Sequence, residues 1–294
     1  MRVLITGSHG LIATELATRL KSLGHEVVPW VRGTKVTGED LETIDAVVNL
    51  AGATTGKMPW TKAYKQELIS SRVETTEMLV NAINESKNPP KVLISGSASG
   101  FYGDTGNDAK SENDPKGTGF LSDLASEWEQ AALKARTRVV LVRTTMVLSR
   151  KLGALGRLLP LVKLGVAGPL GPGSQWWAWI SLPDEARAII HLIETESASG
   201  VYNLTAPEHA TCTQMVRELG RALKRPTLIP VPSFALRIAF GEAADELLIC
   251  NQKMTADKLL ATGFKLLFLP EKPIDPERLL GVIVETLGTR QLAV

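Results

Sequence analysis

The glycine-rich segment near the start of the chain constrains the fold more than any other stretch of the sequence. Residues 2–6 form a short apolar run typical of a strand, the turn Gly7–Gly10 follows, and residues 11–23 carry leucines at helical spacing. Glycines between a strand and a helix let main-chain N–H groups approach a pyrophosphate at the positive end of the helix. We therefore predict a nucleotide-binding turn with cofactor contacts from Gly7, Ser8, Gly10, Leu11 and Ile12.

The chain then alternates apolar strands with helices. Strand-like runs lie at residues 25–31, 46–50, 92–95 and 139–143, and a long helical pattern lies at 67–85. This alternation predicts an α/β fold with a doubly wound parallel sheet. We assign residues 1–150 to a dinucleotide-binding domain. Residues 151–294, where the sequence texture changes, are expected to complete the sheet and to form a smaller C-terminal substrate lobe.

Charge and composition exclude several classes of protein. Thirty-three Lys and Arg against 31 Asp and Glu leave a formal charge of +2, so no global field attracts nucleic acid or anionic lipid, although a local basic pocket is compatible with this balance. No apolar run approaches the roughly 18–20 residues of a membrane span. The four histidines lack metal-ligand spacing, and Cys212 and Cys250 cannot form a disulfide framework. We expect a cytoplasmic protein, a monomer or a homodimer, with a small-molecule substrate and no metal, nucleic-acid or membrane partner.

The end of the second predicted strand distinguishes the two nicotinamide dinucleotides. An NAD site places Asp or Glu there to accept from the ribose 2′-hydroxyl. This chain reads Pro29-Trp30-Val31-Arg32 instead, and Arg32 offers a cation for a 2′-phosphate, with Lys35 nearby. The sequence therefore favours NADP(H) over NAD(H). The alternative is that Arg32 is only a solvated charge at a strand end.

Further motifs resemble one enzyme family. They are Asn49-Leu50-Ala51-Gly52 and Ser95-Gly96-Ser97 at two strand ends, Ser71-Arg72-x-x-x-Thr76, Tyr102-Gly103, Trp128-Glu129, Arg143-x-x-x-Val147, Gly171-x-Gly173-x-Gln175 with Trp179-Ile180, and Asn203-Leu204-Thr205-Ala206-Pro207. As a set they resemble the extended short-chain dehydrogenases/reductases, and among these the atypical, epimerase-like subfamily of NAD(P)-dependent sugar-nucleotide epimerases/dehydratases. The resemblance covers nearly the whole chain. It implies a Rossmann fold and cofactor contacts from Leu50, Ala51, Gly52, Arg72, Ser95, Gly96 and Arg143.

The chain lacks the proton-transfer pair of the wider family, Tyr-x-x-x-Lys. The residues four positions after Tyr64, Tyr102 and Tyr202 are Leu68, Gly106 and Ala206. Proton transfer is then left to two catalytic candidates. Ser97 occupies the position of the family's catalytic serine, and Tyr102 follows in a glycine-rich turn, where an aromatic side chain more often only packs.

Acidic residues on the helix that replaces the Tyr/Lys helix are the next candidates for a base. These are Asp123, Glu127 and Glu129. Acids along a helix face are usually only solvated, and we expect that of these three.

Two arginines have both a functional and a structural interpretation. Arg72 stands near a position where the family generally has Asn facing the cofactor, so it is a candidate for binding a phosphate or a substrate acid; the alternative is an exposed helix cation. Arg143 begins a segment where related enzymes contact nicotinamide and substrate; the alternative is a strand-end Arg paired with a surface acid.

Aromatic residues cluster in the C-terminal half. Gln175, Trp176 and Trp179 are predicted to line the substrate cleft, where Trp stacks on planar or sugar groups. The alternative, a core cluster of the small lobe, is favoured by the usual burial of Trp.

The leading hypothesis for function is an NADP(H)-binding oxidoreductase or epimerase that acts on a small polar or sugar-nucleotide substrate. The first alternative is a catalytically reduced nucleotide sensor or scaffold that keeps the cofactor site. The second is a module that binds a small molecule without redox chemistry.

Overall fold

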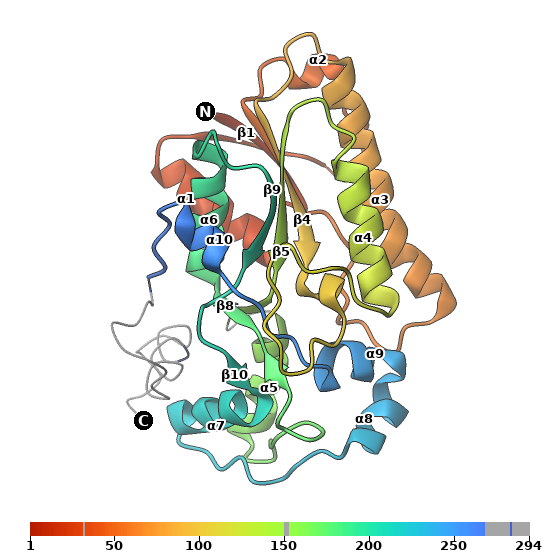
Figure 1. The fold of residues 1–294 in the computed structure, drawn as a ribbon, viewed down its shortest axis with the longest axis vertical. Helices are drawn as coiled ribbons and strands as arrows, with labels where there is room; N and C mark the ends of the chain where they lie inside the picture. The colour runs from red at the N-terminus through yellow and green to blue at the C-terminus, as the bar shows by residue number, and fades with distance from the viewer. Residues whose placement is uncertain (32, 150–152, 268–282, 284–294) are drawn as a thin grey trace.

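A parallel sheet of six strands forms the centre of the computed structural model, which describes residues 1–31, 33–149, 153–267 and 283 (Figure 1). The strands, in spatial order, are β2 (Glu26–Pro29), β1 (Arg2–Thr6), β3 (Ala46–Asn49), β4 (Val92–Ala98), β5 (Arg138–Thr144) and β9 (Gly200–Leu204). From β1 the chain adds β2 on one side and β3 on the other, so the strand order reverses at β1. Open parallel sheets bind ligands beyond the carboxyl ends of the strands at such a reversal.

Helices cover both faces of the sheet (Figure 1). One face carries α1 (Leu11–Ser22), α6 (Leu182–Glu194) and α10 (Asp257–Ala261), and the other carries α2 (Gly38–Leu41), α3 (Lys62–Glu85) and α4 (Phe120–Ala132). Side chains alternate between two buried clusters, because successive strand residues point to opposite faces: Val3 and Ile5 pack on the α1 side, and Leu4 packs on the α3 side. The predicted doubly wound α/β fold is confirmed.

The bounds of two elements differ from the predicted ones. The helix predicted from residue 67 begins at Lys62, because the Thr61 side chain caps it by accepting from the Tyr64 N–H at 3.1 Å. The second strand ends at Pro29, earlier than expected. The 3₁₀ turn η1 (Ser99–Tyr102) follows β4 directly.

The smaller lobe is built from residues that follow β5. Its short strands are β6 (Met146–Leu148), which pairs with β8 (Trp179–Ser181), and β7 (Trp176–Trp177), which pairs with β10 (Ala210–Thr211). Its helices are α5 (Gly153–Lys163), α7 (Cys212–Leu223), α8 (Ser233–Phe240), α9 (Glu242–Ala244) and the π-helical turn η2 (Asp245–Ile249). The segment after residue 150 also supplies β9 and α6 to the main sheet domain, whereas the boundary at residue 150 stays a prediction.

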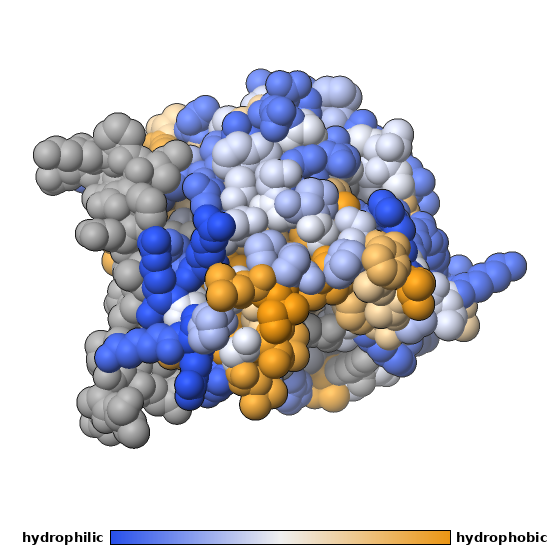
Figure 2. All heavy atoms as spheres, turned by 90° about the horizontal axis from the view of Figure 1, so that it is seen from below, coloured by the Kyte–Doolittle hydropathy of each residue, from blue (hydrophilic) through white to orange (hydrophobic). Residues whose placement is uncertain are grey.

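The lower pole of the small lobe exposes aliphatic side chains next to basic ones (Figure 2). Leu164, Leu228 and Ile238 are 74 %, 82 % and 82 % exposed. None of the helices in the described ranges is long and apolar enough to cross a bilayer.

The turn after β1 lies close to the turn after β3, and two glycines with positive φ provide a test of this close approach. Gly7 lies at the approach, and Gly24 is a control that lies away from it. Gly7 has φ +64°, and a Cβ there would lie 2.5 Å from the Leu50 carbonyl oxygen; Gly24 has φ +79° and nothing within 4 Å. We expect Gly7→Ala to lower the free energy of unfolding by about 2 kcal/mol or more, and the control Gly24→Ala by about 1 kcal/mol, because only the first adds a clash to backbone strain. Urea denaturation measures both. Equal losses would contradict the close approach at Leu50.

Candidate cofactor and substrate site

The N-terminus of α1 offers unpaired main-chain donors. Gly10 caps the helix without a side-chain hydrogen bond, and no acidic residue lies in the first turn. Within the described residues, the N–H groups of Leu11, Ile12 and Ala13 have no hydrogen-bond partner. A pyrophosphate fits such a terminus, because it accepts these hydrogen bonds and carries the charge that the helix dipole favours.

A buried polar network holds the carboxyl ends of β1 and β3 together. The Thr6 hydroxyl donates to Asn49 Oδ1 at 2.7 Å and accepts from the Leu50 and Ala51 N–H groups at 3.1 and 3.2 Å. Asn49 Nδ2 in turn donates to the Thr76 hydroxyl of α3 at 2.8 Å. Because Thr6, Asn49 and Thr76 are completely buried, these bonds fix the turn after β3 beside the glycine-rich turn Gly7–Gly10.

Arg72 lies against the turn that follows β3. Its guanidinium donates to the carbonyl oxygens of Ala53 and Leu68 at 2.9 and 3.1 Å, and a Cβ on Gly52 would lie 2.9 Å from its Cζ. Burial lowers the pKa of Arg72 to about 10. No carboxylate pairs with it in the part of the chain that the structure describes. Arg72 is therefore a half-buried cation beside the turn after β3 rather than an exposed helix cation.

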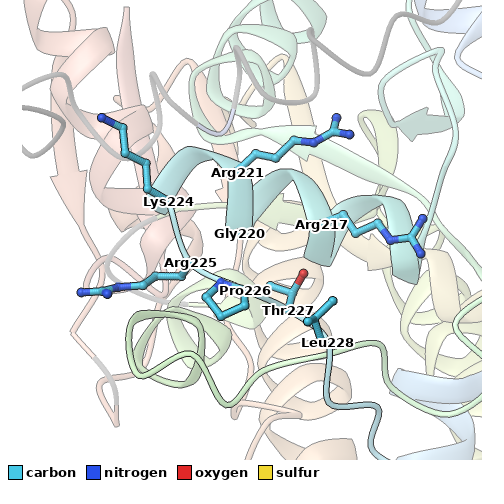
Figure 3. Close-up of a pocket in the computed structure, with 8 residues that line it drawn as sticks. All are labelled: Arg217, Gly220, Arg221, Lys224, Arg225, Pro226, Thr227 and Leu228. Carbon is cyan, nitrogen blue, oxygen red and sulfur yellow. The ribbon is translucent and has the colours of Figure 1, made fainter.

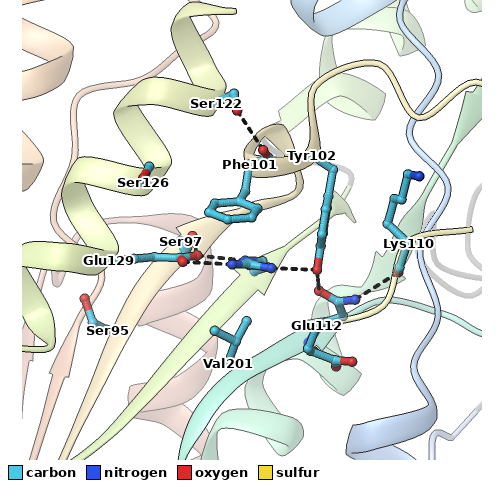
Figure 4. Close-up of polar contacts among 12 residues, drawn as sticks. Ser95, Ser97, Phe101, Tyr102, Lys110, Glu112, Ser122, Ser126, Glu129 and Val201 are labelled. Atoms are coloured by element: carbon cyan, nitrogen blue, oxygen red, sulfur yellow. Dashed lines mark hydrogen bonds and ion pairs between the residues drawn. The ribbon is translucent and has the colours of Figure 1, made fainter. Parts of the chain in front are cut away.

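Ser97, Glu129 and Arg143 form a buried cluster at the ends of β4 and β5 (Figure 4). The Ser97 hydroxyl donates to Glu129 Oε1 at 2.6 Å, and Arg143 donates to both carboxylate oxygens at 2.8 and 2.9 Å. Ser97, Glu129 and Arg143 are 5 %, 6 % and 3 % exposed. Arg143 thus pairs with a buried acid, so the expected alternative of a surface acid is wrong.

Tyr102 belongs to the same cluster. Its hydroxyl accepts from Arg143 Nη1 at 2.8 Å and lies 2.8 Å from Asn203 Oδ1 and 2.9 Å from the Ser111 carbonyl oxygen (Figure 4). Burial raises the pKa of Tyr102, against the lowering influence of the Arg143 charge. The Arg143 guanidinium also stacks on Phe101, with Cζ 3.4 Å from the ring centroid. These contacts commit the Tyr102 hydroxyl to partners inside the protein.

Glu129 is a residue of the buried cluster that the sequence analysis undervalued. Asp123 and Glu127 are exposed, as expected of a solvated helix face, but Glu129 is buried, so that expectation was wrong for it. Helical spacing was the available signal: Ala125, Trp128 and Ala132 are buried apolar residues of α4, and Glu129 lies on the same face.

The cluster predicted to line the substrate cleft is divided between core and surface. Gln175 and Trp179 are each 3 % exposed, and Trp179 packs in the core of the small lobe, which agrees with the core alternative. Gln175 Nε2 donates to the Leu170 and Leu248 carbonyl oxygens at 2.9 and 2.8 Å. Trp176 is half-exposed and donates to Asn107 Oδ1 at 3.1 Å.

Residues 245–252, which follow α8, contact the start of α4 and the turn after β4. Glu246 of η2 accepts from the Phe120 and Leu121 N–H groups at 2.8 and 2.7 Å, so it caps α4 from a distant part of the chain. Burial raises the pKa of Glu246. Gln252 accepts from the Ser99 hydroxyl at 2.6 Å, beside the end of β4. No sequence pattern near Glu246 signals this cap.

The other residues predicted to contact the cofactor include buried residues, half-exposed residues and one residue outside the described part of the chain. Ser95 and Gly96 are buried against α4, where a Cβ on Gly96 would lie 2.7 Å from the Trp128 ring. Gly7 and Ser8 are half-exposed at the turn. Arg32 lies outside the described residues. In the part of the chain with described side chains, no group of three or more His, Cys, Asp and Glu is placed to hold a metal ion.

A cavity of about 340 Å³ lies away from this site, at the C-terminal end of α7 (Figure 3). Its lining includes Arg217, Arg221, Lys224 and Arg225. These side chains point in different directions, so they do not converge on one anion (Figure 3). The carboxyl edge of the sheet is therefore the better candidate site.

Comparisons with known proteins agree with this fold. Residues 3–205 match the NAD dependent epimerase/dehydratase family, and residues 231–266 match a domain of unknown function, DUF1731. An epimerase family protein of Mycobacterium leprae is 40 % identical over 280 residues, which cover 90 % of this chain and 91 % of that protein. The crystal structure of human epimerase family protein SDR39U1 with NADPH is 34 % identical, with a TM-score of 0.88 over 97 % of this chain and 99 % of that one. UDP-glucuronic acid 4-epimerase from Bacillus cereus, at 18 % identity and a TM-score of 0.77, shares the fold over 99 % of this chain and 100 % of that one.

Removing the charge of Glu129 tests the buried cluster. Glu129→Gln leaves the Arg143 guanidinium buried without a counter-charge, so we expect a loss of about 3 kcal/mol in the free energy of unfolding. The control Glu77→Gln breaks an exposed pair with Lys134 and should change it by less than about 0.5 kcal/mol. Urea denaturation at neutral pH compares the two. Similar small losses would show that the buried pair does not hold α4 to β5.

Proposed function

Because the chain belongs to the NAD dependent epimerase/dehydratase family, we propose that it is an NADP(H)-binding oxidoreductase or epimerase acting on a small polar or sugar-nucleotide substrate. One observation carries the proposal: a helix N-terminus with unpaired N–H groups and a buried Ser97–Glu129 pair share one edge of the sheet. The helix N-terminus suits the pyrophosphate of a dinucleotide, and the Ser97–Glu129 pair suits proton transfer at a substrate bound beside that dinucleotide.

The proposed cofactor is NADP(H). A solved relative of 34 % identity is a complex with NADPH, which supports this choice. The absence of an acid after β2, together with Arg32 and Lys35, supports it from the sequence of this chain. When bound, the dinucleotide supplies hydride transfer to and from a substrate carbon. Gly7, Gly10, Leu11 and Ile12 would hold its pyrophosphate.

Ser97 and Glu129 are the proposed proton carriers. A substrate hydroxyl that loses hydride from its carbon must also lose its proton, and Ser97 Oγ can accept that proton while passing its own to Glu129 Oε1, 2.6 Å away. Reduction of a carbonyl runs the same transfers in reverse. Arg143 holds both oxygens of the carboxylate in place, and Tyr102 supports Arg143 in turn. We propose a modest rate, because the Tyr-x-x-x-Lys pair of the wider family is missing.

The second candidate function is a nucleotide sensor that binds the cofactor without turnover. It is favoured by the internal commitments of the Tyr102 hydroxyl and of the Glu129 carboxylate. NADPH oxidation over a panel of carbonyl compounds and nucleotide sugars separates the two functions: turnover supports the enzyme, and tight binding without turnover supports the sensor.

We propose a reducing cytoplasmic environment for the protein. Cys212 and Cys250 are free and buried, and burial raises their thiol pKa values to about 11 and about 12. Such thiols are poor nucleophiles and suit a structural role in a reducing compartment.

Cofactor preference tests the proposed 2′-phosphate contact. If Arg32 pairs with a 2′-phosphate, NADPH should bind about ten- to hundredfold more tightly than NADH, and Arg32→Asp with Lys35→Ala should reverse the preference. Calorimetric titration measures both affinities. As a control for the site, Gly10→Asp places a carboxylate where the pyrophosphate would lie and should abolish binding of either dinucleotide. Equal affinity for both cofactors in wild type and double variant would reject the NADP(H) assignment.

Turnover tests the proposed proton carriers. Ser97→Ala should lower kcat by about 10²-fold or more, because the substrate oxygen loses both its partner and its path to Glu129. Tyr102→Phe should lose less, because Tyr102 acts through Arg143. Steady-state NADPH oxidation with any accepted carbonyl compound measures both. Unchanged kcat in Ser97→Ala would move proton transfer to another group.

A further inference from the structure

Aliphatic side chains gather on the lower pole of the small lobe (Figure 2). They come from the end of α5, from the turn after it and from the segment after α7, and we call them the apolar patch: Leu161, Leu164, Val166, Leu228 and Ile229, all exposed. The two segments run side by side. The Val231 N–H donates to the Pro169 carbonyl oxygen at 2.9 Å. A Cβ on Gly168 would lie 2.0 Å from the Ile229 carbonyl oxygen. Exposed aliphatic residues are common singly, whereas a group of neighbours marks a contact surface.

Basic side chains border the apolar patch. The exposed ones are Lys163, Arg217, Arg221, Lys224 and Arg225. Leu228 lines the same cavity as the four basic residues of α7 and of the turn that ends it, so aliphatic and cationic groups meet there (Figure 3). Lys163 directly precedes Leu164 in the chain. The patch and its basic border therefore form one surface.

Acidic side chains do not neutralise this surface. Within residues 161–169 and 217–231 the sequence contains one acid, Glu218. Glu218 is 4 % exposed and accepts from Arg221 Nη1 at 2.6 Å. The next acids along the chain, Glu242 and Asp245, each form an ion pair with a basic residue outside these two segments. The local charge is therefore strongly positive, although the whole chain carries a formal charge of only +2.

Two simpler explanations account for only part of this arrangement. Basic residues at the end of α7 complement the negative end of the helix dipole, but the dipole gives no reason for exposed aliphatic residues beside them. A single bound phosphate does not suit the cations, because their side chains point in different directions (Figure 3). An extended anionic surface does suit them, since each cation can then meet a separate negative group.

We propose that this pole docks on the surface of a lipid bilayer that contains anionic lipids. The apolar patch enters the boundary between headgroups and acyl chains, and the basic border contacts the lipid phosphates. Burial of apolar groups at that boundary and attraction of cations to a negative surface are the two contributions that hold peripheral proteins on membranes. The exposed Leu164 and Leu228 supply the first contribution, and the cations around them supply the second.

Other occupants fit this surface less well. A second copy of the chain would bring two basic surfaces together, and like charges repel. Single-stranded nucleic acid needs exposed aromatic rings for stacking, whereas the patch is aliphatic. The proposal departs from the sequence-based expectation of no membrane partner, because that expectation rested on net charge and on the lack of a spanning segment. Docking on a surface requires neither a large net charge nor a span.

Co-sedimentation of the full chain with vesicles measures the proposed docking. One set of vesicles consists of phosphatidylcholine alone, and the other of equimolar phosphatidylcholine and phosphatidylglycerol. Wild type should bind the anionic vesicles at least about tenfold more tightly than the neutral ones. Raising the salt concentration from about 0.1 M to about 1 M shortens the Debye length from about 10 Å to about 3 Å, so binding to the anionic vesicles should weaken.

Two variants separate the charged contribution from the apolar one. Arg217→Gln, Lys224→Gln and Arg225→Gln, combined, should weaken binding to anionic vesicles by about a hundredfold. These three residues form no ion pair with any described residue, so their removal leaves no partner unpaired. Leu164→Gln with Leu228→Gln should weaken it by about tenfold, because less apolar surface leaves water.

Matched controls lie at the amino ends of the strands, at the opposite end of the molecule from α7 (Figure 1). Lys87→Gln, Lys91→Gln and Arg136→Gln, combined, remove three exposed cations there. Leu23→Gln with Leu133→Gln removes two exposed aliphatic side chains. Both controls should bind vesicles like wild type. All four variants change exposed residues and should unfold at the wild-type Tm, which shows that any loss of binding is not a loss of fold.

Three results would overturn the proposal. They are no binding of wild type to the anionic vesicles, equal binding to anionic and neutral vesicles, and unchanged binding in the variant that lacks three cations of the border. A protein with an acidic face would then be the better occupant. Self-association that is lost in Leu164→Gln with Leu228→Gln, in the absence of vesicle binding, would instead assign the patch to a second copy, and sedimentation velocity measures it. None of these measurements involves NADPH, so they leave the proposed function untouched.

Discussion

The ion pair between Glu129 and Arg143 is the contact on which the rest of the candidate site depends. It joins α4 to β5 through two hydrogen bonds, and both residues are nearly inaccessible to water. A charge in that environment is tolerated only with a partner in good geometry, so the pair holds helix and strand at a fixed separation. Ser97 and Tyr102 are held by the same two side chains. The packing of α4 and the placement of the candidate site residues are therefore coupled at this edge of the sheet.

The C-terminal part of the chain completes a site that the N-terminal part begins. The segment of residues 231–266, which matches a domain of unknown function, supplies Glu246 to cap α4 and Gln252 to contact Ser99. The segment also contributes the Thr255 carbonyl oxygen to Asn203, which contacts Tyr102. Two of these contacts, Glu246 with the start of α4 and Gln252 with Ser99, join residues more than a hundred positions apart in the sequence. They give the segment a structural purpose, which is to hold the start of α4 and the turn after β4 in place.

Sequence patterns predicted the first hundred residues well because the determining interactions there are local. A β-branched apolar run, a glycine that accepts positive φ and a helix with one apolar face each depend on neighbours within a few positions. The same reasoning failed for Glu129, since residue type was weighed above its place on the buried face of α4. It was also of little use for Trp176 and Trp179, because Trp serves equally well in a core and in a cleft wall.

By itself, the sequence of this chain determined the doubly wound fold, the glycine-rich turn between β1 and α1 and the lack of the Tyr-x-x-x-Lys pair, because each is a pattern of near neighbours. Only the tertiary structure decided that Glu129 faces Arg143 and that Glu246 caps α4. The physical reason is burial. A carboxyl group in water has the same ordinary properties at any position, and its charge state and role are set by the groups that replace water around it. Those groups come from parts of the chain that meet only when it folds.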